Sequence, residues 1–242
     1  MKFLHTSDWH LGQRLQTNER LVEHQQALAW LVQTIDEQQI DCLIVAGDLF
    51  DIANPPTSAQ QLYYSFLTDL LQTNCRYVVI IGGNHDSPNL LNAPKQLLYK
   101  LNIHVVGMAT EQLEEEIIEL KDKHGKLEAV VAAVPFLRDK DLKTSISGET
   151  ALERIAAIRQ ALRQHYQDIG EKVASYRPLN IPILATGHLY LKEVGYHQGR
   201  DNIYIGDREI WQLHTSRKSL IMWHLDTFIT PTALEKYITV VH

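Results

Sequence analysis

The sequence predicts an α/β fold, and three features of its first third indicate this class. Short segments rich in β-branched and aliphatic residues, typical of buried strands, cover residues 2–6, 42–46 and 76–81. Between them, apolar residues recur at helical spacing in the segments 18–38 and 57–72. A polar motif directly follows each strand. Because strands and helices that alternate in this way form βαβ units, we expect a sheet of neighbouring parallel strands.

Each element follows from its own residues. The segment 18–38 places its apolar residues along one face, as an amphipathic helix does. The segment 42–46 is apolar throughout, which indicates a strand buried on both faces, and Gly47 ends it. The prolines of the segment 55–58 start the second helix. The strand 76–81 ends at two glycines, where the backbone can turn sharply.

The second half of the chain has a different pattern. Residues 111–126 are rich in charge, and the segment 127–134 then predicts an edge or sandwich strand. A long amphipathic helix is expected over 148–176, followed by a buried strand over 181–186 that ends at a glycine and His188. Because the sequence contains no internal repeat and no low-complexity linker, a single domain is expected.

Composition limits the possible functions. With 242 residues, of which 45% are hydrophobic and 21% charged, the chain is typical of one globular domain. Its formal net charge of −6 excludes a broadly basic surface, so a nucleic-acid substrate would need a local basic patch, metals or a partner. Cys42 and Cys75 form no CxxC pattern, which favours free thiols. No apolar run suits a signal peptide or a membrane span, so we expect a cytoplasmic protein.

Carboxylates and imidazoles follow the first two strands, at the edge of the sheet where α/β proteins build their sites. Asp8 and His10 lie two residues apart, so both side chains would point the same way from an extended strand end and could bind one metal. Asp48 would emerge at the same edge as a bridging ligand between two divalent ions. A polar strand end in which Asp8 caps a helix is the alternative. Asp51 is expected to support the loop without binding metal.

The motif after the third strand adds an amide, an imidazole and a carboxylate. Asn84 offers a neutral oxygen to a second metal, while His85 would stay uncoordinated and act on a leaving oxygen or a phosphoryl group. Asp86 is expected to fix the orientation of His85. His188 would add a further ligand. A simple turn at 84–86 and a structural role for His188 are the alternatives.

The remaining polar residues indicate no second chemistry. Ser7 and Ser87 adjoin the motifs but lack a histidine and aspartate arrangement of their own, which argues against a nucleophilic serine. The other histidines are interpreted as surface or core residues: His5, His24, His104, His124, His165, His197 and His214. The reaction indicated is the attack of metal-activated water on a phosphodiester in line.

These motifs resemble those of the calcineurin-like metallophosphoesterase superfamily, which are D-x-H, G-D-x-x-D, G-N-H-D and G-H. Within that superfamily, the chain resembles the D-subunit family of SbcCD-type DNA repair nucleases, relatives of the Mre-type nucleases, in the segments 5–12, 133–138, 185–189 and 201–206. The resemblance implies a four-layer sandwich of two mixed β-sheets flanked by helices, incomplete at its C-terminus.

The same resemblance implies a function in DNA repair and recombination. It implies a 3′–5′ double-strand exonuclease and single-strand or hairpin endonuclease with two divalent metal ions, Mn²⁺. The partners implied are DNA and an SbcC-type ATPase subunit. Two copies of this chain would form a homodimer within a heterotetramer that also contains the ATPase. His85 would act on the scissile phosphate. By matching motif, the metal ligands would be Asp8, His10, Asp48, Asn84 and His188.

Residues 207–242 depart from the family, whose next motif, G-H-x-H, is absent from this chain. Read from the third base of the Leu220 codon, codons permitted by the segment 220–231 encode D-Y-V-A-L-G-H-I-H-H-P, which contains that motif. We therefore expect a nuclease domain over 1–206 and an aberrant tail over 207–242, produced by a frameshift near 206–211. Activity would then be impaired. A genuine divergent C-terminus is the alternative.

Two other functions remain possible on this sequence. One is a phosphomonoesterase or cyclic-nucleotide phosphodiesterase on the same scaffold. The other is a non-catalytic scaffold that only binds a partner. The segments 9–12 and 135–138 favour the nuclease over both.

Overall fold

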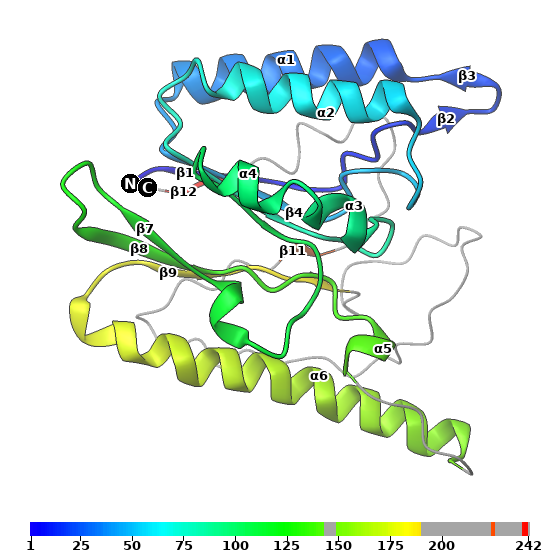
Figure 1. The fold of residues 1–242 in the computed structure, drawn as a ribbon, viewed down its shortest axis with the longest axis vertical. Helices are drawn as coiled ribbons and strands as arrows, with labels where there is room; N and C mark the ends of the chain where they lie inside the picture. The colour runs from blue at the N-terminus through cyan, green and yellow to red at the C-terminus, as the bar shows by residue number, and fades with distance from the viewer. Residues whose placement is uncertain (143–148, 190–223, 226–238, 242) are drawn as a thin grey trace.

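Two β-sheets lie face to face, with helices on their outer sides (Figure 1). The structure is a computed structural model that describes residues 1–142, 149–189, 224–225 and 239–241. Helices α1 (Leu21–Glu37) and α2 (Thr57–Leu70) cover the five-stranded sheet, and α6 (Ala151–Val173) covers the three-stranded sheet. This four-layer α/β arrangement confirms the predicted fold class.

The five-stranded sheet has the order β12-β1-β4-β5-β6. Four of its strands run parallel, and β12 pairs antiparallel with β1. Because β4 lies between β1 and β5, the loop that follows β4 is adjacent to the loops that follow both neighbours. The strands are β1 (Phe3–Thr6), β4 (Cys42–Ala46), β5 (Tyr77–Ile81), β6 (Ile103–Val106) and β12 (Thr239–Val241).

The three-stranded sheet has the order β7-β8-β9, with β7 antiparallel and β9 parallel to β8. Its strands are β7 (Ile117–Lys121), β8 (Leu127–Ala132) and β9 (Ile183–Ala185). Two residues separate β9 from the short strand β10 (His188–Leu189). His188 therefore reaches β4 from the second sheet, with its Nδ1 2.9 Å from the carbonyl oxygen of Ala46.

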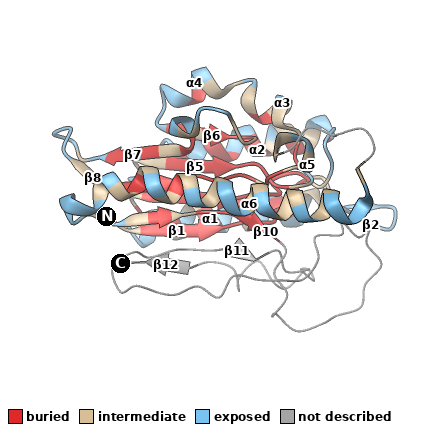
Figure 2. Ribbon diagram, turned by 90° about the horizontal axis from the view of Figure 1, so that it is seen from below, coloured by how far each residue is buried: buried red, intermediate tan, exposed pale blue. Residues whose placement is uncertain are grey.

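Apolar side chains fill the spaces between the layers, and Figure 2 shows the strands as the most buried part of the molecule. Val45 of β4 packs against the helices with Phe66 of α2, whereas Ile44 packs against the other sheet with Val131 of β8. All five residues of β4 are buried, as its uninterrupted apolar run predicts. This strand therefore holds its following loop firmly between the two layers.

The structure differs from the sequence prediction mainly in short elements. A hairpin of β2 (Arg14–Leu15) and β3 (Asn18–Glu19) occupies the segment before α1, so that helix begins three residues later than expected. The elements that the sequence pattern did not show are β6, β7, α3 (Pro88–Asn92), α4 (Lys95–Tyr99), α5 (Asp139–Leu142) and the 3₁₀ turns η1 (Leu113–Glu116) and η2 (Ala174–Leu179). Most of them are too short for a period to emerge.

The expected domain boundary at residue 206 lies outside the described residues. Two strands of the expected tail are described by their backbone: β12 pairs with β1, and β11 (His224–Leu225) runs parallel to β10. Cys42 is buried and Cys75 is half-buried, and both are free thiols. Among the helices that the structure describes, none combines the length and apolar character needed to cross a membrane.

Candidate metal centre

The loops after β1 and β4 run side by side at one edge of the five-stranded sheet. The backbone N–H groups of Asp8 and His10 each donate to the loop after β4, at 3.0 Å from the carbonyl oxygens of Gly47 and Asp48, respectively. Asp8, His10 and Asp48 all have positive φ, at 54°, 46° and 52°. Non-glycine residues rarely adopt this strained region, and such strain concentrates at functional sites.

The expectation that Asp8 and His10 share an extended strand end is therefore wrong, although the two side chains do meet. The strand β1 ends at Thr6, before either residue. The left-handed turns at both residues bring His10 Nε2 to 3.9 Å from Asp8 Oδ1.

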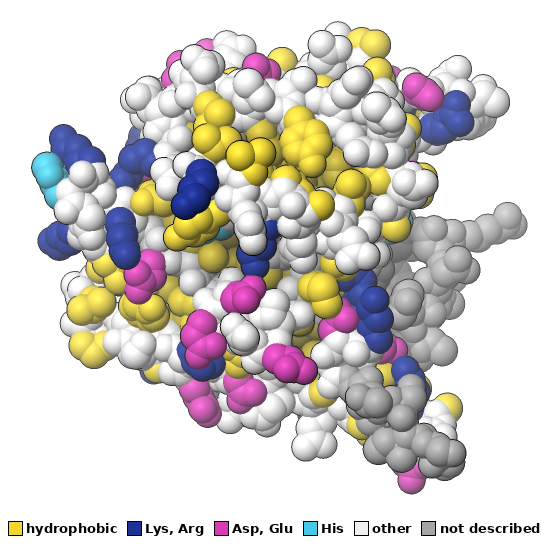
Figure 3. Space-filling model, viewed as in Figure 1, with side chains coloured by type: hydrophobic (Ala, Val, Ile, Leu, Met, Phe, Trp, Pro, Cys, Tyr) yellow, Lys and Arg dark blue, Asp and Glu magenta, His cyan; other side chains and the backbone are white. Residues whose placement is uncertain are grey.

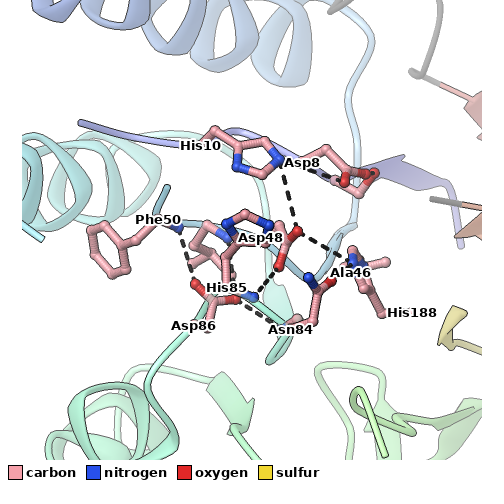
Figure 4. A network of polar contacts seen from close by, with 12 residues as sticks. Asp8, His10, Ala46, Asp48, Phe50, Asn84, His85, Asp86 and His188 are labelled. Carbon is pink, nitrogen blue, oxygen red and sulfur yellow. Dashed lines mark hydrogen bonds and ion pairs between the residues drawn. The ribbon is translucent and has the colours of Figure 1, made fainter. Parts of the chain in front are cut away.

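Asp48 occupies the centre of the site (Figure 4). Its Oδ2 lies 3.7 Å from His10 Nε2 and 3.4 Å from His188 Nε2, and its Oδ1 accepts the backbone N–H of His85 at 2.9 Å. Burial raises the pKa of this carboxyl, but His188, His10 and the N–H of His85 together bring the pKa below its ordinary value. Asp48 is therefore held as a carboxylate between two imidazoles, as a bridging ligand requires.

The other candidate ligands form two groups that share Asp48. Asp8 and His10 come from the loop after β1 and form the first group. Asn84 and His188 form the second, with Asn84 Oδ1 3.0 Å from His188 Nε2. The two groups are close, because ligand atoms of Asp8, Asp48 and His188 all lie within 4.8 Å of one another. The structure thus brings together all five residues that the sequence suggested as ligands, from the loops after β1, β4 and β5 and from the strand β10.

The protons on His188 indicate what this second group can bind. Its Nδ1 lies 2.9 Å from the carbonyl oxygen of Ala46, which can only accept, so Nδ1 carries the hydrogen. In the neutral ring Nε2 then presents a lone pair, and it faces the oxygens of Asn84 and Asp48. Lone pairs that converge without a proton between them suit a cation. Oxygen and imidazole donors together fit a divalent first-row metal.

His85 lies beside the site and is exposed. Its Nδ1 is 2.7 Å from the carbonyl oxygen of Asp51, so Nδ1 donates and Nε2 stays available to a substrate. The ring meets that of His10 edge to face, with centroids 4.9 Å apart. The Asp51 carboxylate also lies 3.4 Å from His10 Nδ1. Asp51 thus supports the loop, as expected, and also orients two imidazoles, which sequence reasoning missed.

Asp86 has a different role from the expected one. Its buried carboxylate accepts the backbone N–H groups of Gly83 at 2.8 Å, Phe50 at 3.0 Å and Leu49 at 3.2 Å. Burial and the nearby Asp48 raise its pKa to about 6, although these N–H groups act in the opposite direction. The side chain therefore ties the loop after β5 to the loop after β4. It is Asp51, not Asp86, that holds the ring of His85.

His10 is surrounded by acidic groups. Burial alone lowers the pKa of its imidazole, but Asp51, Asp48 and Asp8 outweigh burial and raise the pKa above the ordinary value. A concentration of negative charge on three carboxylates around one imidazole is the electrostatic environment that attracts a cation.

The two serines and His165 make structural contacts. The hydroxyl of Ser7 donates to the Asp8 carboxylate, and Ser87 caps α3 by accepting the N–H of Leu90 at 3.4 Å. His165 pairs with the fully buried Glu116 at 2.8 Å and so joins α6 to η1. His197 and His214 lie outside the described residues.

We expect Gly83→Ala to displace Asp48 and to weaken metal binding. A Cβ at residue 83 would lie 2.1 Å from Asp48 Oδ1 and 2.3 Å from Asp48 N, closer than real atoms approach. Overpacking of this kind costs about 1–3 kcal/mol or more in the free energy of unfolding. Thermal unfolding and Mn²⁺ titration of the variant would measure both effects.

Gly170→Ala is the matched control, because a Cβ there meets nothing within 4 Å. Gly170 lies inside α6, where alanine is favoured by about 0.5–1 kcal/mol. We expect this variant to be slightly more stable and to bind metal normally. Equal metal affinity in both variants would contradict the close packing of Gly83 against Asp48.

Comparisons with known proteins agree with this geometry. The family model for calcineurin-like phosphoesterases matches residues 1–208. Among curated proteins, the D subunit of the SbcCD nuclease from Escherichia coli (strain K12) is 41% identical over 210 residues, which are 85% of this chain and 50% of that protein. The corresponding protein from Rhodobacter capsulatus is 37% identical over 78% of this chain and 48% of its own length. The one from Bacillus subtilis is 34% identical over 79% and 47%.

The chain spans about half the length of these relatives, and the family model matches most of the chain itself. The matched residues contain every side chain of the site described above. The chain therefore belongs to the calcineurin-like phosphoesterase family.

Proposed function

We propose that this chain carries the catalytic centre of a DNA nuclease that uses two divalent metal ions, preferentially Mn²⁺. The observation that carries the proposal is the position of Asp48 between two groups of ligands, with His85 exposed beside them. Asp8 and His10 would hold one ion, Asn84 and His188 the other, and Asp48 both. The names of the relatives, which are nuclease subunits, support a nucleic-acid substrate.

The chain's own residues divide the work of phosphodiester hydrolysis. When bound, two divalent ions supply Lewis-acid activation of water and of the scissile phosphate. His85 would contact the phosphate or the leaving oxygen through Nε2, because its Nδ1 is held by the Asp51 carbonyl. In the imidazolium form, which is protonated at both nitrogens, it would donate the Nε2 proton to the leaving oxygen. Asp51 also orients His10, and Asp86 keeps the two loops at a fixed separation.

The proposed partners follow from charge and from the relatives. A net charge of −6 gives the chain little general affinity for DNA, which favours a second protein that supplies part of the contact with DNA. We propose an SbcC-type ATPase for this role, since the relatives are named as the D subunits of SbcCD nucleases. A nuclease for DNA repair and recombination would act in the bacterial cytoplasm, where the chromosome lies.

A homodimer is the proposed oligomeric state. Figure 3 shows hydrophobic side chains gathered over α2 and α4, where Leu97 is 69% and Tyr99 58% exposed. An exposed apolar patch favours a protein interface, and a second copy of the chain is the occupant we propose. Light scattering should give twice the mass of the chain. A monomeric mass at the highest soluble concentration would contradict the dimer.

Activity on defined substrates tests the function. With Mn²⁺, the chain should shorten duplex DNA from its ends and cut hairpins, more slowly than a chain with its reading frame restored, and chelation should stop both reactions. Hydrolysis of nitrophenyl phosphate or cyclic AMP without cleavage of DNA would favour the phosphomonoesterase or cyclic-nucleotide phosphodiesterase. A folded chain that binds no Mn²⁺ by elemental analysis would favour a non-catalytic scaffold.

We further propose that residues 207–242 are a frameshifted tail and that the nuclease domain covers residues 1–206. Two observations support this: the family match ends at residue 208, and a shifted reading frame permits G-H-I-H. The gene sequence beyond the codon of residue 206 tests it directly. An open shifted frame that encodes G-H-I-H supports the proposal, and a closed frame would show that the tail is genuine. Restoring the frame should raise Mn²⁺ affinity, because each ion would gain an imidazole.

A further inference from the structure

The loop Gly83–Asp86 carries the amide and the imidazole of the site, and it is held from two sides. The Asp86 carboxylate binds N–H groups of this loop and of the loop after β4. On the other side, Arg138 Nη2 donates to the carbonyl oxygen of Asp86 at 2.7 Å and to that of Gly83 at 3.3 Å. One guanidinium nitrogen therefore joins the first and last carbonyls of a four-residue loop, with Asn84 and His85 between them.

Arg138 comes from the other sheet. It follows β8 on the segment that leads to α5, and the same segment makes a second contact with the loop region, from Phe136 N–H to the Gly82 carbonyl oxygen at 2.8 Å. The ring of Phe136 also meets His188 edge to face, with centroids 6.2 Å apart. This segment thus contacts the ring of His188 directly and the backbone on either side of Asn84. We assign no metal ligand to the segment itself.

The guanidinium is placed to hold the loop and not to bind a substrate. Arg138 is half-buried, and its Nη1 is enclosed with no hydrogen-bond partner among the described residues. Both contacts of Nη2 go to backbone carbonyls. A planar, permanently charged fork can keep two carbonyls at a fixed spacing, which a flexible ammonium does less well.

We propose that Arg138 is a positioning residue for the second metal site and for His85, acting through the backbone of the loop Gly83–Asp86. This inference rests on the proposed two-metal function. Loss of the guanidinium would free the Gly83 and Asp86 carbonyls and let Asn84 and His85 shift. Asp8 and His10 belong to the loop after β1, so the first metal site would change less. The residue of that site that the loop Gly83–Asp86 contacts directly through its backbone is Asp48, which accepts the N–H of His85.

Mn²⁺ binding, followed by the loss of the free-ion electron paramagnetic resonance signal, tests this without any activity assay. In Arg138→Met we expect one Mn²⁺ to bind as in the unsubstituted chain and the other about 10- to 100-fold more weakly, as for residues that orient ligands. Arg138→Lys should be intermediate. DNA cleavage should show kcat lower by about 10²-fold with little change in KM, because reacting groups are misplaced while DNA contacts remain.

Arg76→Met is the matched control. Arg76 is also a cross-sheet arginine, which contacts Asp41 and Glu128 at 3.0 and 2.8 Å, respectively, but it lies before β5, at the opposite end of that strand from the site. The Arg76→Met variant should bind both ions normally. Unchanged binding of both ions in Arg138→Met would overturn the inference, and so would equal weakening of both sites in Arg138→Met and Arg138→Lys. No Mn²⁺ binding by the unsubstituted chain would instead overturn the proposed function together with the inference.

Discussion

Asp48→Asn is expected to abolish hydrolysis and to weaken Mn²⁺ binding in both halves of the site. Asp48 Oδ2 lies 3.7 Å from the imidazole of His10 in one group and 3.4 Å from that of His188 in the other. Asparagine removes the bridging charge and leaves the side-chain shape unchanged. It also tolerates the positive φ of 52° at this position, so the loop should keep its conformation.

Calorimetric titration with Mn²⁺ and DNA cleavage would measure the two effects. We expect affinity to fall by about 100-fold or more, as when a metal site loses a ligand charge as well as its orientation. Asp69→Asn is the control, because this exposed aspartate lies on α2 and takes no part in the site. If Asp48→Asn bound two ions normally, the bridging assignment would be wrong.

His85→Ala is expected to abolish cleavage while both ions stay bound. The Nδ1 of this imidazole is held by the Asp51 carbonyl, and its ring is exposed beside the ligands without belonging to either group. Loss of a general acid costs about 10²- to 10⁴-fold in rate. Mn²⁺ affinity should change little, in contrast to Asp48→Asn.

His85→Gln refines this test. A glutamine amide can still donate to the Asp51 carbonyl, so the loop contact persists while proton transfer is lost. Both variants should be inactive with normal Mn²⁺ binding, and His124→Gln, in an exposed turn, should be fully active. Cleavage at the normal rate by either His85 variant would remove this residue from the mechanism.

The sequence predicted the parts of this molecule that depend on local pattern. The strand Cys42–Ala46 was predicted to the residue, because an apolar run that ends in glycine is a signal carried by consecutive positions. The polar motifs after β1, β4 and β5 meet because the ends of adjacent parallel strands share one edge of the sheet. Local pattern and simple topology were sufficient for these features.

The roles of individual side chains in holding the site could not be predicted in this way. Asp86 was assigned to its sequence neighbour His85, yet two of its partners, Leu49 and Phe50, are 37 and 36 residues away in the chain. Arg138 contacts Asp86 across 52 residues. Hydrogen bonds between distant segments follow from the packing of two sheets, and no spacing in a single sequence encodes them. The charged segment 111–126 likewise contains the strand β7, whose alternate residues are buried, and its many charged residues concealed that alternation.

The proposed ligands of the site come from both sheets, so a bound cation would be a cross-link in the fold. Asn84 follows β5 of one sheet, and His188 follows β9 of the other, 104 residues later. Because the ion would bind Asn84 and His188 together, its binding free energy would add to the free energy of unfolding. Separation of the two sheets would require release of the ion. Without metal, α6 and the three-stranded sheet could open as a separate unit. With metal, we expect amide hydrogens of β8, β9 and α6 to exchange with solvent only when the whole molecule unfolds.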